Sequence, residues 1–247
     1  LHLSLRRQRQ MCIRDRDKSF EFNKSFVFDN ISFSYCNESE FILKDANFVL
    51  SPNKIICIVG ESGIGKSTIA KLIIRIIFPN KGNIYIDDVP IYDIDLKSYR
   101  NNVGFMPQKP IIIDDSLLEN IVMGYDNYNT NQINLIVKDT GLENLILKLP
   151  NGIYSKIGTH GFKVSEGEAQ RIALARIILR NPKIIILDEP TASLDNDTEN
   201  KIICTIKNIK EQSKSLVIII THKESTMSLA DKIIYVKNKN IIIEEIS

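Results

Sequence analysis

Two patterns of hydrophobic and polar positions along the chain predict β-strands. Large apolar and small polar residues alternate over 26–35, which is typical of a half-buried strand. Residues 55–59 and 216–220 are continuously apolar, as expected for strands buried on both faces. The strands predicted from these patterns are 26–35, 41–50, 55–59, 83–87, 183–188, 216–221, 232–236 and 240–245, the last two forming a hairpin around 237–239.

Between these strands, apolar residues recur at helical spacing. The predicted helices are 66–78, 166–179 and 197–212, and residues 116–149 carry helical spacing up to the break at 150–152. Pro79 ends the first helix, and the pair Asn181-Pro182 follows the second. Strands that alternate with helices predict an α/β fold with a mainly parallel sheet and helices on both faces.

Composition narrows the class of protein. The chain has 247 residues, of which 43% are hydrophobic and 25% charged, so a collagen-like, mucin-like or wholly disordered chain is excluded. No apolar run approaches the roughly 18 residues of a membrane span, and no secretory signal is present. Four widely separated cysteines, Cys12, Cys36, Cys57 and Cys204, favour neither a zinc site nor a disulfide framework and suit a reducing compartment.

Charge is unevenly distributed. The net charge is +2, but residues 1–16 carry five arginines against Asp15, a local sum of +4, which leaves −2 for the remainder. A basic arm that is disordered, or that binds a membrane surface or nucleic acid, is one interpretation. We favour another, in which 7–16 resembles translated sequencing-adapter read-through. We therefore set residues 1–19 apart as an artefactual or disordered leader, and expect native sequence to be missing ahead of Phe20.

A phosphate-binding loop follows the buried strand at 55–59. The run Gly60-Glu61-Ser62-Gly63-Ile64-Gly65-Lys66-Ser67 matches G-x-x-x-x-G-K-[ST] and precedes a helix that continues with Thr68. Glycines let successive backbone N–H groups point at a phosphate, and the helix N-terminus favours the same anion. Lys66 is expected to reach the β- and γ-phosphates of a nucleotide, and Ser67 to ligate Mg²⁺.

Two carboxylates end the predicted strand at 183–188. Asp188 is expected to hold the water shell of Mg²⁺. Glu189 comes next and is expected to polarise a water in line with the γ-phosphate. Together with the loop at 60–67, this pair predicts a nucleotide-hydrolysing site.

Further motifs resemble those of the ABC family of ATPases. The runs 164–168 and 169–176 are similar to the family's signature motif and its helix, and 192–195 to its D-loop, which ends at Asp195. His222 stands where the family has its switch histidine, Gln108 where it has its Q-loop and Tyr35 where it has its aromatic A-loop. The motifs occur in the family's order and span nearly everything after Phe20.

The resemblance implies a role for each of these residues. Tyr35 would stack on adenine, Gln108 would touch Mg²⁺ or the attacking water, and His222 would contact the γ-phosphate and orient the water of Glu189. The signature residues would act in trans, because two such domains meet head to tail around two ATP. Those residues are Ser165, Glu166, Gly167 and Glu168.

One departure from the family pattern lies in the signature. The usual motif is Leu-Ser-Gly-Gly-Gln, whereas this chain has Val164-Ser165-Glu166-Gly167-Glu168. Glu166 adds a negative charge near a triphosphate, which is unfavourable unless its side chain points to solvent. Since Ser165 and Gly167 are kept, we expect a working motif. The alternative of a heterodimer, in which one of the two ATP sites hydrolyses slowly, stays open.

The resemblance also implies an architecture and partners. It implies an N-terminal antiparallel β subdomain and a helical subdomain at approximately 109–180, within an ABC ATPase domain at 20–247. Segments 113–121, 149–152 and 157–161 resemble the exporter branch. The expected partners are a second ABC ATPase domain and a fused transmembrane domain, at the cytoplasmic face of a plasma or inner membrane, with no nucleic acid. An importer ATPase subunit, a soluble ABC ATPase without transport and a regulatory subunit are the alternatives.

Overall fold

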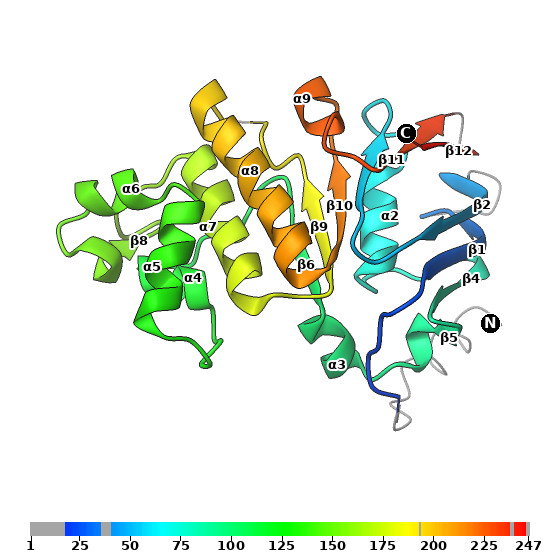
Figure 1. Cartoon of the computed structure of the whole chain (residues 1–247), viewed down its shortest axis with the longest axis horizontal. Helices are drawn as coiled ribbons and strands as arrows, with labels where there is room; N and C mark the ends of the chain where they lie inside the picture. Colours follow the sequence, from blue (N-terminus) through cyan, green and yellow to red (C-terminus); the bar gives the residue numbers. More distant parts are fainter. Residues whose placement is uncertain (1–17, 36–40, 193, 238–239, 246–247) are drawn as a thin grey trace.

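The structure is a computed structural model, and it describes residues 18–35, 41–192, 194–237 and 240–245. Figure 1 shows a central sheet with an antiparallel β unit on one side and a group of short helices on the other. The predicted Lys237-Asn238-Lys239 turn and the leader at 1–19 lie partly outside the described residues, and Cys12 and Cys36 lie wholly outside them.

The central sheet has six strands in the order β12-β11-β3-β10-β9-β6. Only β12 runs antiparallel to its neighbour, while the other pairings are parallel. The strands are β3 (Ile55–Val59), β6 (Val103–Met106), β9 (Ile184–Asp188), β10 (Leu216–Ile220), β11 (Lys232–Lys237) and β12 (Asn240–Glu245).

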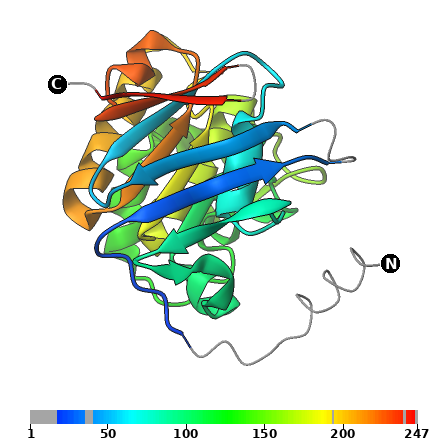
Figure 2. The ribbon, with the colours of Figure 1, turned by 90° about the vertical axis from the view of Figure 1, so that its right-hand side faces the viewer.

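A second, antiparallel sheet has the order β2-β1-β4-β5 and faces the viewer in Figure 2. Its strands are β1 (Phe26–Phe33), β2 (Leu43–Leu50), β4 (Lys81–Ile86) and β5 (Val89–Pro90). A two-stranded ladder pairs β7 (Asp115–Ser116) with β8 (Lys156–Ile157).

Helices connect these strands. The α-helices are α2 (Lys66–Ile73), α3 (Leu96–Asn101), α4 (Leu117–Val122), α5 (Thr130–Asp139), α6 (Glu143–Lys148), α7 (Glu166–Arg180), α8 (Asn196–Ser213) and α9 (Glu224–Met227). Two 3₁₀ turns are η1 (Ile91–Asp93) and η2 (Gly152–Tyr154). None of the helices in the described ranges combines the length and the hydropathy that a bilayer crossing requires.

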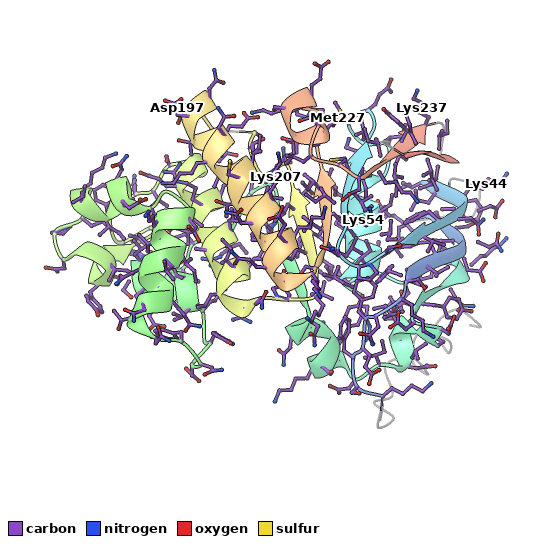
Figure 3. All side chains as sticks on the ribbon, in the orientation of Figure 1. Lys44, Lys54, Asp197, Lys207, Met227 and Lys237 are labelled. Atoms are coloured by element: carbon purple, nitrogen blue, oxygen red, sulfur yellow. The ribbon has the colours of Figure 1, made fainter. Side chains whose placement is uncertain are left out.

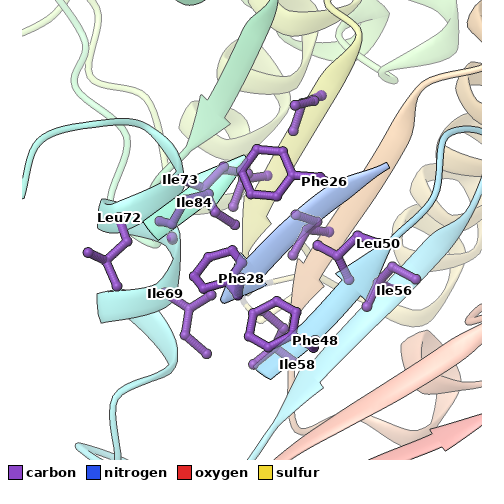
Figure 4. Packing of buried hydrophobic residues seen from close by; sticks show 14 of the residues in the cluster. Phe26, Phe28, Phe48, Leu50, Ile56, Ile58, Ile69, Leu72, Ile73 and Ile84 are labelled. Atoms are coloured by element: carbon purple, nitrogen blue, oxygen red, sulfur yellow. The ribbon is translucent and has the colours of Figure 1, made fainter. Parts of the chain in front are cut away.

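The continuous apolar strands are explained by burial on both sheet faces. Along β9, Ile184 and Ile186 pack with α2 and the antiparallel sheet, whereas Ile185 and Leu187 pack with α7 and α8. Successive strand residues point to opposite faces, so both sets must be apolar. Figure 4 shows the first of these cores, where Phe28 stacks on Phe48 with ring centroids 4.1 Å apart.

Helix α7 joins the sheet to the group of short helices. Its Ala173, Leu174 and Ile177 belong to the core beneath the central sheet. Its Ile172 and Ala175 belong to a separate core with α4, α5 and α6. The middle of α7 is therefore packed between two cores.

The structure refines two of the helical segments predicted from the sequence. The helix predicted over 66–78 ends at Ile73, because Arg75 adopts a left-handed conformation with φ 59°. The helical spacing predicted over 116–149 corresponds to three helices, α4, α5 and α6, which are separated where Met123, Gly124 and Gly141 have positive φ. Periodicity alone does not reveal these breaks, because apolar spacing continues through them.

Other differences are omissions. The sequence prediction missed β6 and α3, and it began β4 two residues late. The predicted α/β fold, with a mainly parallel sheet and an antiparallel β unit, is confirmed. The boundaries 109 and 180 of the helical subdomain stay a prediction.

Candidate nucleotide-binding site

The candidate residues gather at the carboxyl edge of the central sheet. Four neighbouring parallel strands, β3, β10, β9 and β6, end there together. The loop at 60–67 follows β3, His222 follows β10, Asp188 and Glu189 end β9, and Gln108 follows β6. This is the edge at which open α/β sheets bind ligands.

Glycine is required at two points of the loop at 60–67. Gly65 has φ 116° and caps α2 without a side-chain hydrogen bond, so a side chain there would be strained. A Cβ at Gly60 would lie 2.7 Å from the carbonyl oxygen of Val236 on β11. The loop can therefore follow its tight path only with glycine at these positions.

Lys66 closes the loop at 60–67 on itself. Its Nζ donates to the carbonyl oxygens of Gly60 at 2.7 Å and of Glu61 at 2.8 Å. The first turn of α2 contains no acidic residue. Its positive N-terminal end and the Lys66 ammonium thus form a site suited to an anion.

Ser67 and Asp188 form a pair of oxygen donors beside this loop. The Ser67 hydroxyl donates to Asp188 Oδ2 at 3.1 Å, and Asp188 is only 9% exposed. Burial raises the pKa of the Asp188 carboxyl, and the Glu189 charge adds to this, whereas the Ser67 hydrogen bond and the charge of Lys66 oppose it. A buried carboxylate next to a hydroxyl is a donor set that fits Mg²⁺.

Glu189 lies between Gln108 and His222. Gln108 Nε2 donates to Glu189 Oε2 at 2.8 Å, and His222 Nδ1 lies 3.4 Å from Glu189 Oε1. Glu189 has φ 51°, an unusual conformation for a side-chain-bearing residue, and its amide donates to the carbonyl oxygen of Ile220. The three predicted catalytic side chains are therefore brought together, with Gln108 on Glu189 rather than on the Ser67–Asp188 pair.

Tyr35 lies beside α2, and about half of the residue is exposed to solvent. It is 51% exposed, and its hydroxyl lies 3.4 Å from both Thr68 Oγ1 and Lys71 Nζ. Phe33 packs edge-on at a centroid distance of 4.9 Å, and the Lys71 ammonium lies 5.5 Å from the ring centroid. The ring is thus oriented by its neighbours and available for stacking.

The signature residues form the N-terminal turn of α7. Ser165 is the N-cap, and its hydroxyl and amide both donate to Glu168 Oε2, at 2.9 and 2.7 Å. Glu166 is exposed and Gly167 is buried. The side chain of Glu166 can therefore remain in solvent, and Glu168 holds the Ser165 hydroxyl in a defined position.

Asp195 caps α8. Its carboxylate accepts hydrogen bonds from the Thr198 amide at 3.0 Å and the Thr198 hydroxyl at 2.8 Å, which lower the pKa of Asp195.

Three residues near the candidate site were not singled out from the sequence. They are Lys71, which lies beside Tyr35, and Glu199 and Lys223, which lie near His222. The only sequence signal for Lys223 is its position directly after His222.

Comparison with known proteins gives consistent matches. The ABC transporter family model matches residues 43–192, more than half of the chain. The heavy metal tolerance protein of Schizosaccharomyces pombe is 38% identical over 216 residues, which are 87% of this chain and 26% of that protein. The mitochondrial iron-sulfur clusters transporter ABCB7 of Rattus norvegicus is 38% identical over 208 residues, covering 84% of this chain and 27% of that protein.

A solved structure is similar throughout. It is a bacterial Atm1-family ABC exporter with ATP bound, which matches with a TM-score of 0.83 and 33% identity over 91% of this chain and 39% of that one. The chain thus spans well under half the length of each of these relatives. Both the matched family model and the fold agree with the motifs described above, and the chain belongs to the ABC transporter family as an ATP-binding domain.

Proposed function

We propose that this chain is the ATP-hydrolysing domain of an ABC exporter and that it powers transport through a transmembrane domain. The observation that carries the proposal is the convergence of Lys66, Asp188, Glu189 and His222 at one edge of the parallel sheet. The relatives' names are those of transporters, which supports a role in transport. One of these relatives, the ABCB7 transporter, is named as mitochondrial, so the membrane in this proposal is either that of the cell surface or that of an organelle.

Nucleotide binding in this proposal uses the loop at 60–67 and Tyr35. Backbone N–H groups at the start of α2, with Lys66, would hold the phosphates. Tyr35 would stack on the adenine. Ser67 and Asp188 would hold Mg²⁺, with Gln108 as a third candidate ligand. When bound, Mg²⁺ would neutralise part of the negative charge of the phosphates.

Hydrolysis in this proposal uses Glu189 and His222. Glu189 would accept a proton from the attacking water, as its position between Gln108 and His222 allows. His222 would donate a hydrogen bond to the γ-phosphate. Gln108 donates to Oε2 of Glu189, so movement of the segment after β6 would change how this carboxylate is held.

The signature turn would complete the site of a second copy or a homologous domain. Ser165 would offer its hydroxyl, Gly167 its amide and α7 its N-terminal dipole to the nucleotide of the partner. Asp195, at the start of α8, would lie at the same interface. The active unit is therefore a head-to-tail dimer in this proposal, closed by ATP and opened by hydrolysis.

The proposal is tested by ATP turnover of the chain as a function of its concentration. We expect turnover per chain to rise with concentration and then level off, because only the dimer is active. Phosphate release in the presence of Mg²⁺ gives the rate. A rate per chain that stays constant over a wide range of concentrations would contradict the shared site, and no turnover at any concentration would contradict hydrolysis.

Replacing Tyr35 by alanine tests the adenine contact. We expect Tyr35→Ala to raise the KM for ATP by about tenfold with a smaller change in kcat, since base–aromatic stacking contributes about 1–3 kcal/mol. Steady-state kinetics over a range of ATP concentrations measure both constants. Tyr35→Phe keeps the ring and should behave like the wild type, as should Tyr154→Ala, which removes an exposed tyrosine of the η2 turn. An unchanged KM in Tyr35→Ala removes Tyr35 from the site.

A further inference from the structure

A partly buried ion pair attaches the loop that carries His222 to the start of α8. Lys223 Nζ donates to Glu199 Oε2 at 2.6 Å and to the carbonyl oxygen of Thr191 at 2.6 Å. Ser225 Oγ donates to the other oxygen of the same carboxylate. Glu199 is 7% exposed, whereas the Lys223 side chain is 28% exposed, so the pair is partly removed from water. One ammonium thus joins three segments of the chain.

The charges of this pair depend on each other. Burial by itself would raise the pKa of Glu199, but hydrogen bonds from Lys223 and Ser225, with the Lys223 charge, hold that pKa below its usual value. Glu199 is therefore ionised at neutral pH and balances the ammonium. Removing one partner leaves the other as an uncompensated charge in a poorly solvated place.

The pair holds the backbone next to two catalytic candidates. Lys223 directly follows His222, and Thr191 lies two residues after Glu189. The hydroxyls of Thr191 and Thr226 are 3.3 Å apart, and both residues are buried. The segments after β9 and after β10 are therefore fastened to each other by the same small cluster.

His222 needs such support because its side chain has little of its own. The imidazole is 67% exposed, and the contact that the structure shows for it is Glu189, 3.4 Å away. Glu189 in turn occupies a left-handed backbone conformation, which persists only where surrounding structure enforces it. The backbone of the two loops must therefore set the distance between His222 and Glu189.

We propose that Glu199 and Lys223 are positioning residues that hold the His222 loop in register with Glu189 and with the D-loop. The D-loop residues Leu194 and Asp195 lie between Thr191 and Glu199 in the sequence, and Lys223 contacts both of these flanking residues. Figure 3 shows the first turn of α8, marked by Asp197, and the end of α9, marked by Met227, at the same edge of the molecule. A shift of the D-loop is passed to His222 through this pair. This inference rests on the proposed function, in which His222 acts on ATP.

The kinetic test compares three variants of the full chain with the wild type. We expect Lys223→Met to lower kcat by about 10- to 100-fold, the effect of a small misplacement of a reacting group, while the KM for ATP stays unchanged. Lys223→Arg keeps the positive charge and the donors and should retain most of kcat. Lys201→Met is the matched control. Lys201 also lies on α8, and this variant breaks its exposed ion pair with Glu143, whose atoms are 3.5 Å apart, so kcat should be unchanged.

The double variant Glu199→Gln/Lys223→Met guards against loss of folding. It removes both charges together, which proteins tolerate better than an unpaired buried charge. We expect it to melt near the wild-type temperature and still to show the low kcat, because the attachment is absent. Wild-type kcat in the folded double variant would overturn the proposal, as would an equal loss in Lys201→Met.

Amide hydrogen exchange gives a reading that does not need catalysis. Lys223→Met should speed exchange over 221–227 and 194–199 and leave α4 unchanged, since α4 belongs to a different core. Unchanged exchange at 221–227 would overturn the proposal. If the wild-type chain fails to hydrolyse ATP, the proposed function fails, and the exchange measurement still decides whether the pair holds the loop.

Discussion

Glu189→Gln is expected to lower kcat for ATP hydrolysis by at least about 100-fold, because a positioned general base contributes about 10²–10⁴ to the rate. The substitution keeps the shape of the side chain and a hydrogen-bonding partner for Gln108, but an amide cannot accept the proton of the attacking water. Binding of ATP should persist, so the ATP-bound dimer should accumulate. Phosphate release measures the first effect, and size-exclusion chromatography with Mg²⁺ and ATP the second.

The matched control for this substitution is Glu211→Gln. It makes the same chemical change at an exposed position near the end of α8 and should leave both the rate and the dimer unaffected. If Glu189→Gln kept a wild-type kcat, Glu189 would not be the base. If it lost the rate without accumulating a dimer, hydrolysis would stand but the role of ATP in holding two copies together would not.

A mixture of two inactive variants is expected to recover ATP hydrolysis. Lys66→Ala removes the ammonium of the loop at 60–67, and Ser165→Arg blocks the signature turn, so each variant alone should be nearly inactive. In a mixed dimer, the intact loop of one copy faces the intact signature of the other. One of the two sites is then complete, and the mixture should hydrolyse ATP well above the sum of the separate rates.

This recovery would be specific to a head-to-tail arrangement. If each copy used its own signature, every site in the mixture would contain a defect and the rates would simply add. Ser165 also caps α7, so its replacement costs about 1 kcal/mol of stability, and melting temperatures should be recorded for both variants. The control is a mixture of either variant with the double variant Glu189→Gln/Ser165→Arg. Neither mixture should recover activity, because no site in it combines an intact loop, an intact base and an intact facing signature.

Local sequence determined most of the elements but not their ends. The alternation over 26–35 and the apolar runs at 55–59 and 216–220 predicted strands that the structure contains, because burial on one or both faces leaves a direct pattern. The helical spacing over 116–149 predicted helices that the structure contains, but it did not show that positive φ at Met123, Gly124 and Gly141 divides them into three. Strand β6 was missed, because its four residues, Val103 to Met106, are too short for a periodic signal.

The sequence by itself also determined where the residue types that a nucleotide site requires occur along the chain. The glycines and Lys66 of the loop at 60–67, and the carboxylates at 188–189, have a chemistry that their spacing and neighbouring strand make recognisable. Only the tertiary structure decided how Gln108, Glu189 and His222 meet, since these residues lie in separate segments that strand order alone brings together. The Glu199–Lys223 pair is likewise a result of the tertiary structure. Neither the burial of Glu199 nor the 2.6 Å contact between the two side chains can be deduced from the order of residues along the chain.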